Sequence, residues 1–401
     1  MKTKATPQLC NDKICTGCAA CYNSCPANAI TMQHNVEGFY RPIINAALCI
    51  SCLKCEQACP ILTAIERQSQ IFESKLYAGW IRNEKIRKES SSGGAFTALA
   101  TATLSAGGVV YGAAYDKNMV IFHSRVDTLD ALNTLRLSKY AQSYIGDVFR
   151  QVKKDLQKGH NVLFCGTPCQ AAGLRGYLKK EYETLVTCDF ICHGVPSPLM
   201  LKSYKDWLER RTTEHISKIN FRDKRKGWYD AVRIAETSRK SYVLKGNYDN
   251  YWIGFNDNKN LQECCYECKF IGIKRNTDIT IADFWGIGKQ TAFGHKTEIK
   301  DGISAIIIST PKGEQLFEKA RHLMKIFRRD ISEIIEGNTA MVKSSRRPIQ
   351  RDSFYRDLLD LPYDSMITKY LQPNFKSRVV KFFREYLPAS VTTKIREICQ
   401  K

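Results

Sequence analysis

The sequence of 401 residues contains no run of about eighteen uninterrupted apolar residues, which argues against a membrane-spanning helix. Its N-terminus, from Met1 to Cys10, lacks the apolar core of a secretory signal. It has no G-x-G-x-x-G after a strand-like run and no G-x-x-x-x-G-K-[ST], so a conventional Rossmann or P-loop nucleotide site is not expected. These absences predict a cytoplasmic protein.

Acidic residues are scarce relative to basic ones. The chain has 40 Asp and Glu against 61 Lys and Arg, a formal net charge of +21. A large excess of one sign favours partners of the opposite sign, here a phosphorylated or carboxylate-bearing cofactor, an acidic protein, nucleic acid or anionic lipid.

Cysteine, by contrast, is abundant, with 17 residues. A reducing compartment disfavours structural disulfides, so dense cysteine there more often indicates metal binding. Eight of the cysteines form two copies of C-x-x-C-x-x-C-x-x-x-C-P, namely Cys15, Cys18, Cys21, Cys25 with Pro26, and Cys49, Cys52, Cys55, Cys59 with Pro60. This is the spacing of a bacterial-type ferredoxin with two [4Fe–4S] clusters.

In that spacing three cysteines of one copy hold a cluster and the fourth reaches the other cluster. We therefore expect Cys15, Cys18, Cys21 and Cys59 at the first cluster, and Cys49, Cys52, Cys55 and Cys25 at the second. Pro26 and Pro60 suit the first turn of a short helix. Two alternatives are a helical repeat of similar period, whose aromatic and alanine pattern is missing, and zinc, which usually takes two cysteine pairs per ion. Cys10 lies outside both quartets and is expected to be a bystander.

After a polar linker, the remaining chain predicts alternating strands and helices, an α/β or α+β pattern. Strands are expected at 76–81, 109–115, 119–125, 161–165, 185–191, 278–285 and 302–309, and helices at 95–105, 146–157, 170–178, 198–210 and from 311.

Three features of this region suggest ligand binding. The Ser90–Gly94 loop precedes a predicted helix, whose free N–H groups suit a phosphate, although a plain helix cap is an equal alternative. Gly166, Thr167 and Pro168 directly follow a buried strand, where ligands bind in α/β sheets. Cys169, Cys192 and the pair Cys265 and Cys268 supply four thiolates for a third cluster, with zinc or unliganded buried cysteines as alternatives.

In this order, these motifs resemble the family of coenzyme F(420) hydrogenase/dehydrogenase beta subunits, which are flavin- and cluster-bearing reductases. The resemblance covers roughly residues 75–310. Its motifs are Ser92-Gly-Gly94, Leu137-Ser-Lys-Tyr-Ala-Gln-Ser143, Gly166-Thr-Pro-Cys-Gln170, Cys192-His-Gly-Val-Pro-Ser197, Lys226-Gly-Trp228, Cys265-x-x-Cys268 and Asp278-Ile-Thr-Ile-Ala-Asp-Phe-Trp-Gly286.

The resemblance implies an FAD held by Ser92, Gly93, Gly94, Lys139, Tyr140, Ser143, Gly166, Thr167 and Pro168. It also implies a third [4Fe–4S] cluster on Cys169, Cys192, Cys265 and Cys268, with Cys165, Cys188 and Cys264 off the family pattern. Lys139, His193 and Lys226 become candidate catalytic residues at the flavin or substrate; the alternative for each is a purely structural role.

The expected fold class is α+β. A ferredoxin domain spans residues 1–66, an α/β flavin-binding reductase region spans 67–158 (FAD-binding) and 159–330 (FAD and third cluster), and a basic helical tail spans 331–401. The expected activity is that of an oxidoreductase passing electrons between clusters and FAD, with a coenzyme F(420)-like or other conjugated substrate and a protein electron donor or acceptor. The alternative is a ferredoxin-type protein that only delivers electrons to a partner enzyme.

Two further expectations concern the surface charge. The basic stretches 85–88, 222–226 and 343–351 come with no nucleic-acid fold motif, so no nucleic acid is expected. Apolar residues between Phe375 and Leu387 fall on one helical face bordered by Lys and Arg. That helix either packs on the core or makes peripheral contact with an acidic partner or membrane surface.

Overall fold

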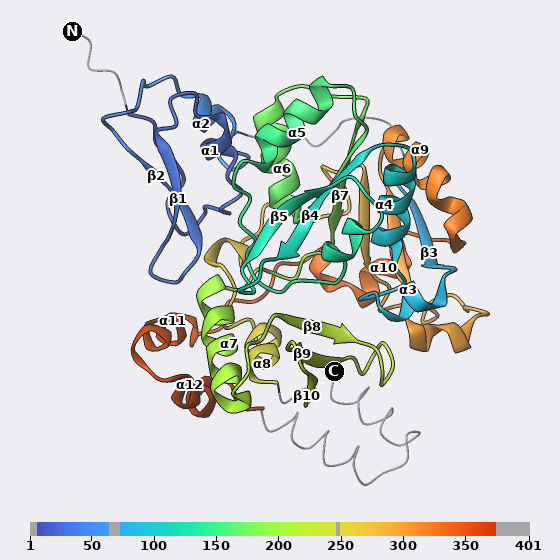
Figure 1. Cartoon of the computed structure of the whole chain (residues 1–401). Coiled ribbons are helices and arrows are strands. Elements are labelled where there is room, and N and C mark those ends of the chain that lie inside the picture. The colour runs from blue at the N-terminus through green and yellow to red at the C-terminus, as the bar shows by residue number, and fades with distance from the viewer. Residues whose placement is uncertain (1–5, 64–72, 246–248, 374–401) are drawn as a thin grey trace.

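The computed structural model describes residues 6–63, 73–245 and 249–373 (Figure 1). The ferredoxin domain contains α1 (Ala20–Ser24), β1 (Ile30–His34), β2 (Tyr40–Ile44) and α2 (Lys54–Gln57), with β1 and β2 paired antiparallel. Each cysteine loop enters its helix through a left-handed residue, Ala19 at φ 62° or Leu53 at φ 58°. The backbone thus repeats as the sequence does.

The prediction that Pro26 and Pro60 begin helices is wrong, because both lie in turns that follow α1 and α2. A residue without an N–H group is tolerated there because the helix has already ended.

One eight-stranded sheet forms the centre of the molecule, in the order β13-β3-β12-β11-β7-β6-β4-β5. The four strands β4, β6, β7 and β11 are parallel, and the strands outside them run antiparallel to their neighbours. The bounds are β3 Lys75–Ile81, β4 Val109–Tyr115, β5 Ile121–Val126, β6 Val162–Cys165, β7 Leu185–Phe190, β11 Ile279–Asp283, β12 Ser304–Ile308 and β13 Met324–Arg329. The sheet therefore combines strands from both parts of the expected reductase region, 67–158 and 159–330.

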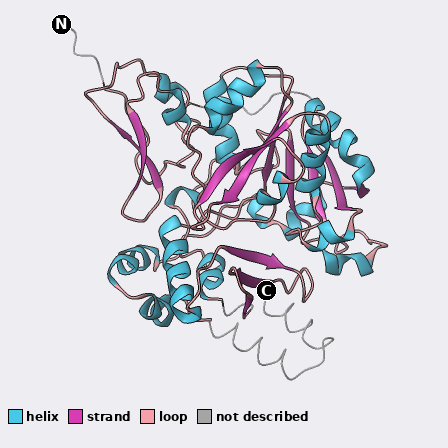
Figure 2. Cartoon of the chain, in the orientation of Figure 1, coloured by secondary structure: helices cyan, strands magenta, loops and turns pink. Residues whose placement is uncertain are grey.

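Helices cover both faces of this sheet (Figure 2). Side chains of α4 (Ala95–Ser105) and α9 (Pro311–Ala320) pack on Val110 and Leu163. Those of α5 (Val148–Gln157) and α6 (Pro168–Leu178) pack on Tyr111 and Phe164 on the other face, together with α1 of the ferredoxin domain. Successive side chains of β4 and β6 therefore point into two separate hydrophobic cores, as expected for strands that are buried on both sides.

A second layer, which the sequence did not predict, lies below the sheet in Figure 1. It combines a three-stranded antiparallel sheet with four helices around a core that includes Phe221, Tyr251 and Phe354. The elements are α7 Pro198–Thr212, β8 Lys218–Asp223, β9 Val232–Glu236, β10 Ser241–Leu244, α8 Asn250–Asn256, α11 Arg351–Asp360 and α12 Tyr363–Tyr370. Two short helices, α3 (Glu84–Lys88) and α10 (Ser332–Gly337), belong to the large-sheet part.

The mixed α/β architecture with an N-terminal iron–sulfur domain is thus as predicted. The amphipathic segment from Phe375 to Leu387 lies outside the described residues. None of the helices in the described ranges has the length and apolar character needed to cross a bilayer.

Candidate functional site

The structure brings the two predicted cysteine quartets together around two separate voids. Cys15, Cys18 and Cys21 line the first void with Cys59 from the second sequence copy. Cys49, Cys52 and Cys55 line the other with Cys25 from the first copy. The fourth cysteine of each copy therefore crosses over, which is how interlocked ferredoxin clusters are held.

Backbone N–H groups point at several of these sulfurs. Gly17 N–H donates to Cys15 Sγ (3.4 Å), Ser51 N–H to Cys49 Sγ (3.4 Å) and Ala29 N–H to Cys25 Sγ (3.2 Å). Such bonds stabilise thiolate, so the residues fit a pair of clusters. Within the described ranges, no three Cys, His, Asp or Glu side chains are grouped in a way that could hold a single metal ion.

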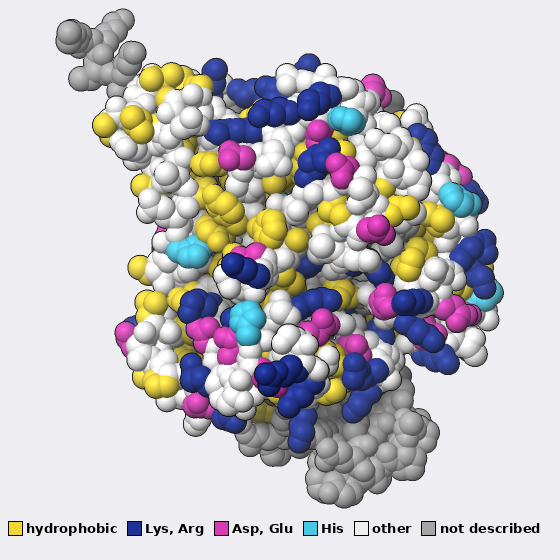
Figure 3. Space-filling view, viewed as in Figure 1, with side chains coloured by type: hydrophobic (Ala, Val, Ile, Leu, Met, Phe, Trp, Pro, Cys, Tyr) yellow, Lys and Arg dark blue, Asp and Glu magenta, His cyan; other side chains and the backbone are white. Residues whose placement is uncertain are grey.

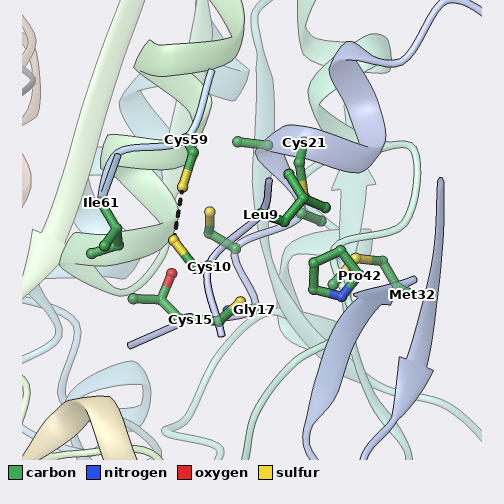
Figure 4. Close-up of a pocket in the computed structure, with 13 residues that line it drawn as sticks. Leu9, Cys10, Cys15, Gly17, Cys21, Met32, Pro42, Cys59 and Ile61 are labelled. Carbon is green, nitrogen blue, oxygen red and sulfur yellow. Dashed lines mark hydrogen bonds between the residues drawn. The ribbon is translucent and has the colours of Figure 1, made fainter. Parts of the chain in front are cut away.

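Cys10 also lines the first void, which the sequence did not predict (Figure 4). Its Sγ lies 3.5 Å from Cys59 Sγ, and this contact lowers the pKa of Cys59 to about 6 while raising that of Cys10. If Cys59 ligates the first cluster, its sulfur carries no proton and Cys10 is the S–H donor, which places a fifth cysteine beside the first cluster.

Replacing Cys10 with alanine should make the reduction potential of the first cluster more negative, because a hydrogen bond to a ligating sulfur favours the reduced, more negative state. Iron content should stay at about eight atoms for the ferredoxin domain. Spectroelectrochemical titration measures the potential. An unchanged potential, or loss of one cluster, would show that Cys10 does not act as this donor.

The four cysteines proposed for a third cluster come from separate elements that converge. Cys169 begins α6, Cys192 follows β7, and Cys265 and Cys268 lie in and after the 3-10 helix Glu263–Cys265. Burial raises the pKa of Cys169, and the charges of Cys264, Cys192 and Cys268 raise it further. Burial and the charge of Cys268 raise the pKa of Cys192 to about 12. Thiols that destabilise one another's charged forms in this way become compatible when a cationic iron cluster binds them.

The off-pattern cysteines lie in two different places. Cys165 and Cys188 are opposite each other on β6 and β7. Cys264 instead adjoins the third group. A hydrogen bond with Cys265 lowers the pKa of Cys264, and the charge of Cys264 raises the pKa of Cys169.

A short polar bridge joins the first cluster loop to the third cysteine group. Gln262 Nε2 donates to Thr16 O (3.2 Å) and to Cys264 Sγ (2.8 Å). Gln142 Nε2 donates to Gln262 Oε1 (3.1 Å), and Gln142 Oε1 accepts from Tyr40 N–H (2.7 Å). Cys15 and Cys264 are close enough for the charge of Cys264 to raise the pKa of Cys15, after the larger effect of burial.

A cavity of about 480 Å³ adjoins the third cysteine group, which contributes Cys169 and Cys192 to its wall. This is an ordinary volume for a cofactor site. Of the residues proposed for FAD or catalysis, the lining includes Ser92, Gly94, Lys139, Tyr140, Ser143, Gly166, Thr167 and His193. It does not include Gly93, Pro168 or Lys226, and Lys226 is exposed.

The Ser90–Gly94 loop is anchored by hydrogen bonds of Ser92, whereas the helix N-terminus that follows the loop has no side-chain cap. Lys224 Nζ donates to Ser92 O (2.6 Å) and Ser92 Oγ to Ile303 O (3.0 Å). A Cβ on Gly93 would lie 2.4 Å from Gly79 O, so glycine is needed there for packing against β3. Gly94, at φ 88°, precedes α4 without any side-chain cap, which leaves the helix N-terminus available to an anion.

A buried hydrogen-bond chain shapes the Gly166–Thr167 side of the cavity. Thr167 and Gln170 form a capping box at the start of α6, and Gln170 Nε2 donates to Ser143 Oγ (2.9 Å). The Ser143 hydroxyl is then the donor to His123 Nδ1 (3.0 Å), and His123 Nε2–H donates to Cys165 O (3.1 Å). Burial lowers the pKa of His123 to about 4, so its ring is neutral and fixed in one tautomer.

Lys139 is a cation whose charge burial disfavours. Its Nζ donates to Arg136 O (2.7 Å) and Thr134 O (3.2 Å), with no carboxylate partner among the described residues. Burial lowers its pKa to about 7, and the charge of Lys218 contributes to that shift. His193 Nε2 lies 2.6 Å from Asn258 Oδ1, and burial lowers the pKa of this histidine too.

Arg222, which the sequence did not single out, also lines the cavity and is 7% exposed. Its guanidinium lies over the Trp285 ring (4.8 Å) and 3.4 Å from Asp283 Oδ2, but Nε and Nη2 have no hydrogen-bond partner among the described residues. Trp228 Nε1 donates to Asp283 Oδ1 (2.7 Å), and Asp283 lines the cavity. The Lys226-Gly-Trp228 motif therefore contributes to the cavity wall through its tryptophan, which holds Asp283. In the sequence Arg222 is hidden in a run of charged residues.

Residues 14–62 match the family described as 4Fe-4S dicluster domain. Residues 159–333 match the family described as the C terminus of the beta subunit of coenzyme F420 hydrogenase/dehydrogenase. Over 328 residues the chain is 21% identical to the F subunit of the F(420)H(2) dehydrogenase from Methanosarcina mazei, covering 78% of this chain and 84% of that protein. A xenon-derivatised structure of the F420-reducing [NiFe] hydrogenase complex from Methanosarcina barkeri aligns at 17% identity and TM-score 0.45, over 73% of this chain and 90% of that chain.

Proposed function

We propose that this chain, in which a 4Fe-4S dicluster domain precedes the C-terminal region typical of coenzyme F420 hydrogenase/dehydrogenase beta subunits, is an iron–sulfur flavoprotein oxidoreductase. The observation that carries the proposal is the adjacency of three cysteine groups and one large cavity. Cys169 and Cys192 belong both to the third group and to the cavity wall.

The cysteine groups form a route from the surface to the cavity. Cys52 of the second quartet is exposed, whereas Cys15 of the first is buried and neighbours Cys264 at the third group. In the proposed route, electrons pass from the second cluster to the first cluster, then to the third cluster and finally to the ligand in the cavity. When bound, the clusters carry single electrons and a flavin couples them to two-electron chemistry.

The chain's own residues fit an FAD in the cavity. The uncapped α4 N-terminus suits a phosphate, and Ser92, whose hydroxyl donates to Ile303 O, fixes the loop that leads into it. Gly166 and Thr167 present backbone at the carboxyl end of β6. Lys139 places a cation where negative charge on a reduced ring would be stabilised. Gly93 and Pro168 support these segments from outside the cavity.

Arg222 and its aromatic neighbours suit a second ligand, the substrate. The unsatisfied N–H groups of a buried arginine favour an anionic oxygen group. Trp285 and Trp252 also line the cavity and give its wall the aromatic character that suits a conjugated ring. The substrate class is therefore a conjugated, acidic compound such as the coenzyme F(420) named for the relative in Methanosarcina mazei.

The test is to purify the protein without oxygen and reduce it. Bound flavin whose visible absorbance bleaches on reduction, and reappears when a conjugated acceptor is added, supports the proposal. Protein that carries clusters but binds no flavin, even when FAD is supplied, would instead favour a role in delivering electrons to a partner enzyme.

Affinity for the anionic ligand near Lys139 should fall as pH rises from about 6 to about 8. The folded-state pKa of Lys139 is lowered to about 7, so the cation is present below that pH and is lost above it. If ligand binding raises this pKa by about one unit, the affinity changes about tenfold. Flavin titrations of the apoprotein at several pH values measure this, and Lys139→Gln should bind weakly at every pH. A wild-type profile without a step near pH 7 would contradict the assignment.

A further inference from the structure

We propose that the face of the ferredoxin domain around Cys52, together with the lysines on the adjoining α5 and α6, is the docking surface for an acidic one-electron carrier protein. This inference rests on the proposed function, in which the second cluster is the outer end of the electron route. We call this face the Cys52 surface and define it by Leu48, Ile50, Leu53 and Cys52 with the flanking Lys54, Lys153, Lys154, Lys179 and Lys180.

The centre of the Cys52 surface is apolar and lies directly over the second cysteine quartet. Leu48 and Ile50 are 53% exposed and Leu53 is 38% exposed, although all three are large aliphatic residues. Ile50 and Cys52 also line the void that the second quartet surrounds. A partner seated on these side chains would therefore be separated from the cluster by a single layer of residues.

The flank of the surface is basic because α5 and α6 are fastened to the ferredoxin domain beside this quartet. Arg150 of α5 donates to Cys25 O (3.3 Å) and Asn23 O (3.0 Å), and Lys179 Nζ donates to Gln57 Oε1 (2.7 Å) on α2. Figure 3 shows Lys and Arg side chains gathered over α5, next to the apolar side chains of the ferredoxin domain.

These lysines are not neutralised within the part of the chain that the structure describes. None of Lys54, Lys153, Lys154, Lys179 or Lys180 forms an ion pair with a described carboxylate. Two of the nearby acids are already engaged: Asp147 pairs with Arg150, and Glu181 with Arg175 and Lys312. Glu56 and Glu183 are further acids close to these five lysines in the sequence, and the lysines outnumber them. The local positive charge is thus left for a partner.

An apolar centre with a charged rim is the composition expected of a transient protein–protein contact. The rim here is positive and the whole chain carries +21, so the matching carrier is acidic and is steered by charge. Exposed aliphatic side chains directly over the cysteine quartet favour a protein occupant over a polyanion, which would use the lysines alone.

The experiment compares wild-type holoprotein with Lys154→Glu/Lys180→Glu and with a matched control, Lys296→Glu/Lys319→Glu. Both variants reverse two exposed lysines, and the control pair lies away from the ferredoxin domain, in the Lys296–Asp301 turn and on α9 (Figure 1). The probe is a strongly acidic [2Fe–2S] ferredoxin, and its Kd is measured by titration at low and high ionic strength.

We expect the Lys154/Lys180 variant to bind the probe about tenfold more weakly than wild type, and the control within about twofold. Wild-type Kd should rise with salt. Equal binding of the ferredoxin by the two variants overturns the proposal. Binding to anionic phospholipid vesicles is measured as well, and the proposal also fails if the Lys154/Lys180 variant loses affinity for the vesicles but not for the ferredoxin. Reduction of the bound flavin by methyl viologen that dithionite has first reduced is recorded in parallel and should be the same in all three proteins. Failure of that reaction in wild type, with ferredoxin binding intact, would count against the proposed function alone.

Discussion

Replacing Cys265 with alanine should lower the iron content from about twelve to about eight atoms per chain, because the proposed third cluster would lose one of its thiolates. The two ferredoxin clusters should remain, since their eight cysteines line separate voids. Electrons entering at the ferredoxin domain should then no longer reach the cavity at a useful rate. Iron and sulfide analysis, with stopped-flow flavin reduction by a reduced ferredoxin, measures both effects.

The matched control for this prediction is Cys188→Ala. Cys188 is fully buried on β7 and pairs in register with Cys165, off the family pattern. This variant should keep about twelve irons. If Cys265→Ala also kept them and Cys264→Ala did not, Cys264 would be the ligand in its place. If neither Cys265→Ala nor Cys264→Ala lost iron, a third cluster on this cysteine group would be contradicted.

Replacing Arg351 with methionine should destabilise the folded chain by about 1–3 kcal/mol, because the partly buried carboxylate of Glu37 is left without its partner. Arg351 is 2% exposed on α11 and donates through both Nη atoms to Glu37 Oε1 (2.8 Å) and Oε2 (2.7 Å). Glu37 lies in the turn between β1 and β2, so this pair ties the second layer to the ferredoxin domain. The thermal midpoint of unfolding should fall, and the ferredoxin domain should become more accessible to protease.

The double variant Arg351→Met/Glu37→Met tests the reason for that loss. It should be less destabilised than Arg351→Met alone, because no partly buried carboxylate is left without its cation. Glu263, which also contacts Arg351 (3.0 Å), keeps Arg347 as a partner in both variants. Strictly additive effects of the two substitutions would show that the Arg351–Glu37 contact contributes little.

The predictable part of the fold was the part with strong local signals. The strand at 109–115 and the helix at 95–105 were predicted with the bounds that β4 and α4 have, because apolar runs and small-residue periodicity mark them clearly. The ferredoxin domain followed from cysteine spacing alone, since cluster geometry dictates which thiols meet.

The unpredicted part depends on tertiary contacts. Strand β8 carries Lys218, Arg222 and Asp223, so its sequence suggests a solvated loop, yet Phe221 and Ile219 bury it in the second layer. Arg222 could not be recognised as a cavity residue, because only the folding of that layer against the large sheet brings it to the same cavity as Lys139. Cys10 was likewise outside any motif, and only its distance to Cys59 reveals its place.

The most direct test of the whole account is quantitation of iron, acid-labile sulfide and flavin in the wild-type chain, purified without oxygen. We predict about twelve irons, about twelve sulfides and one FAD per chain, from three cubes and one cavity. A colourless protein that carries zinc, or one with eight irons and no flavin even after reconstitution, would contradict it.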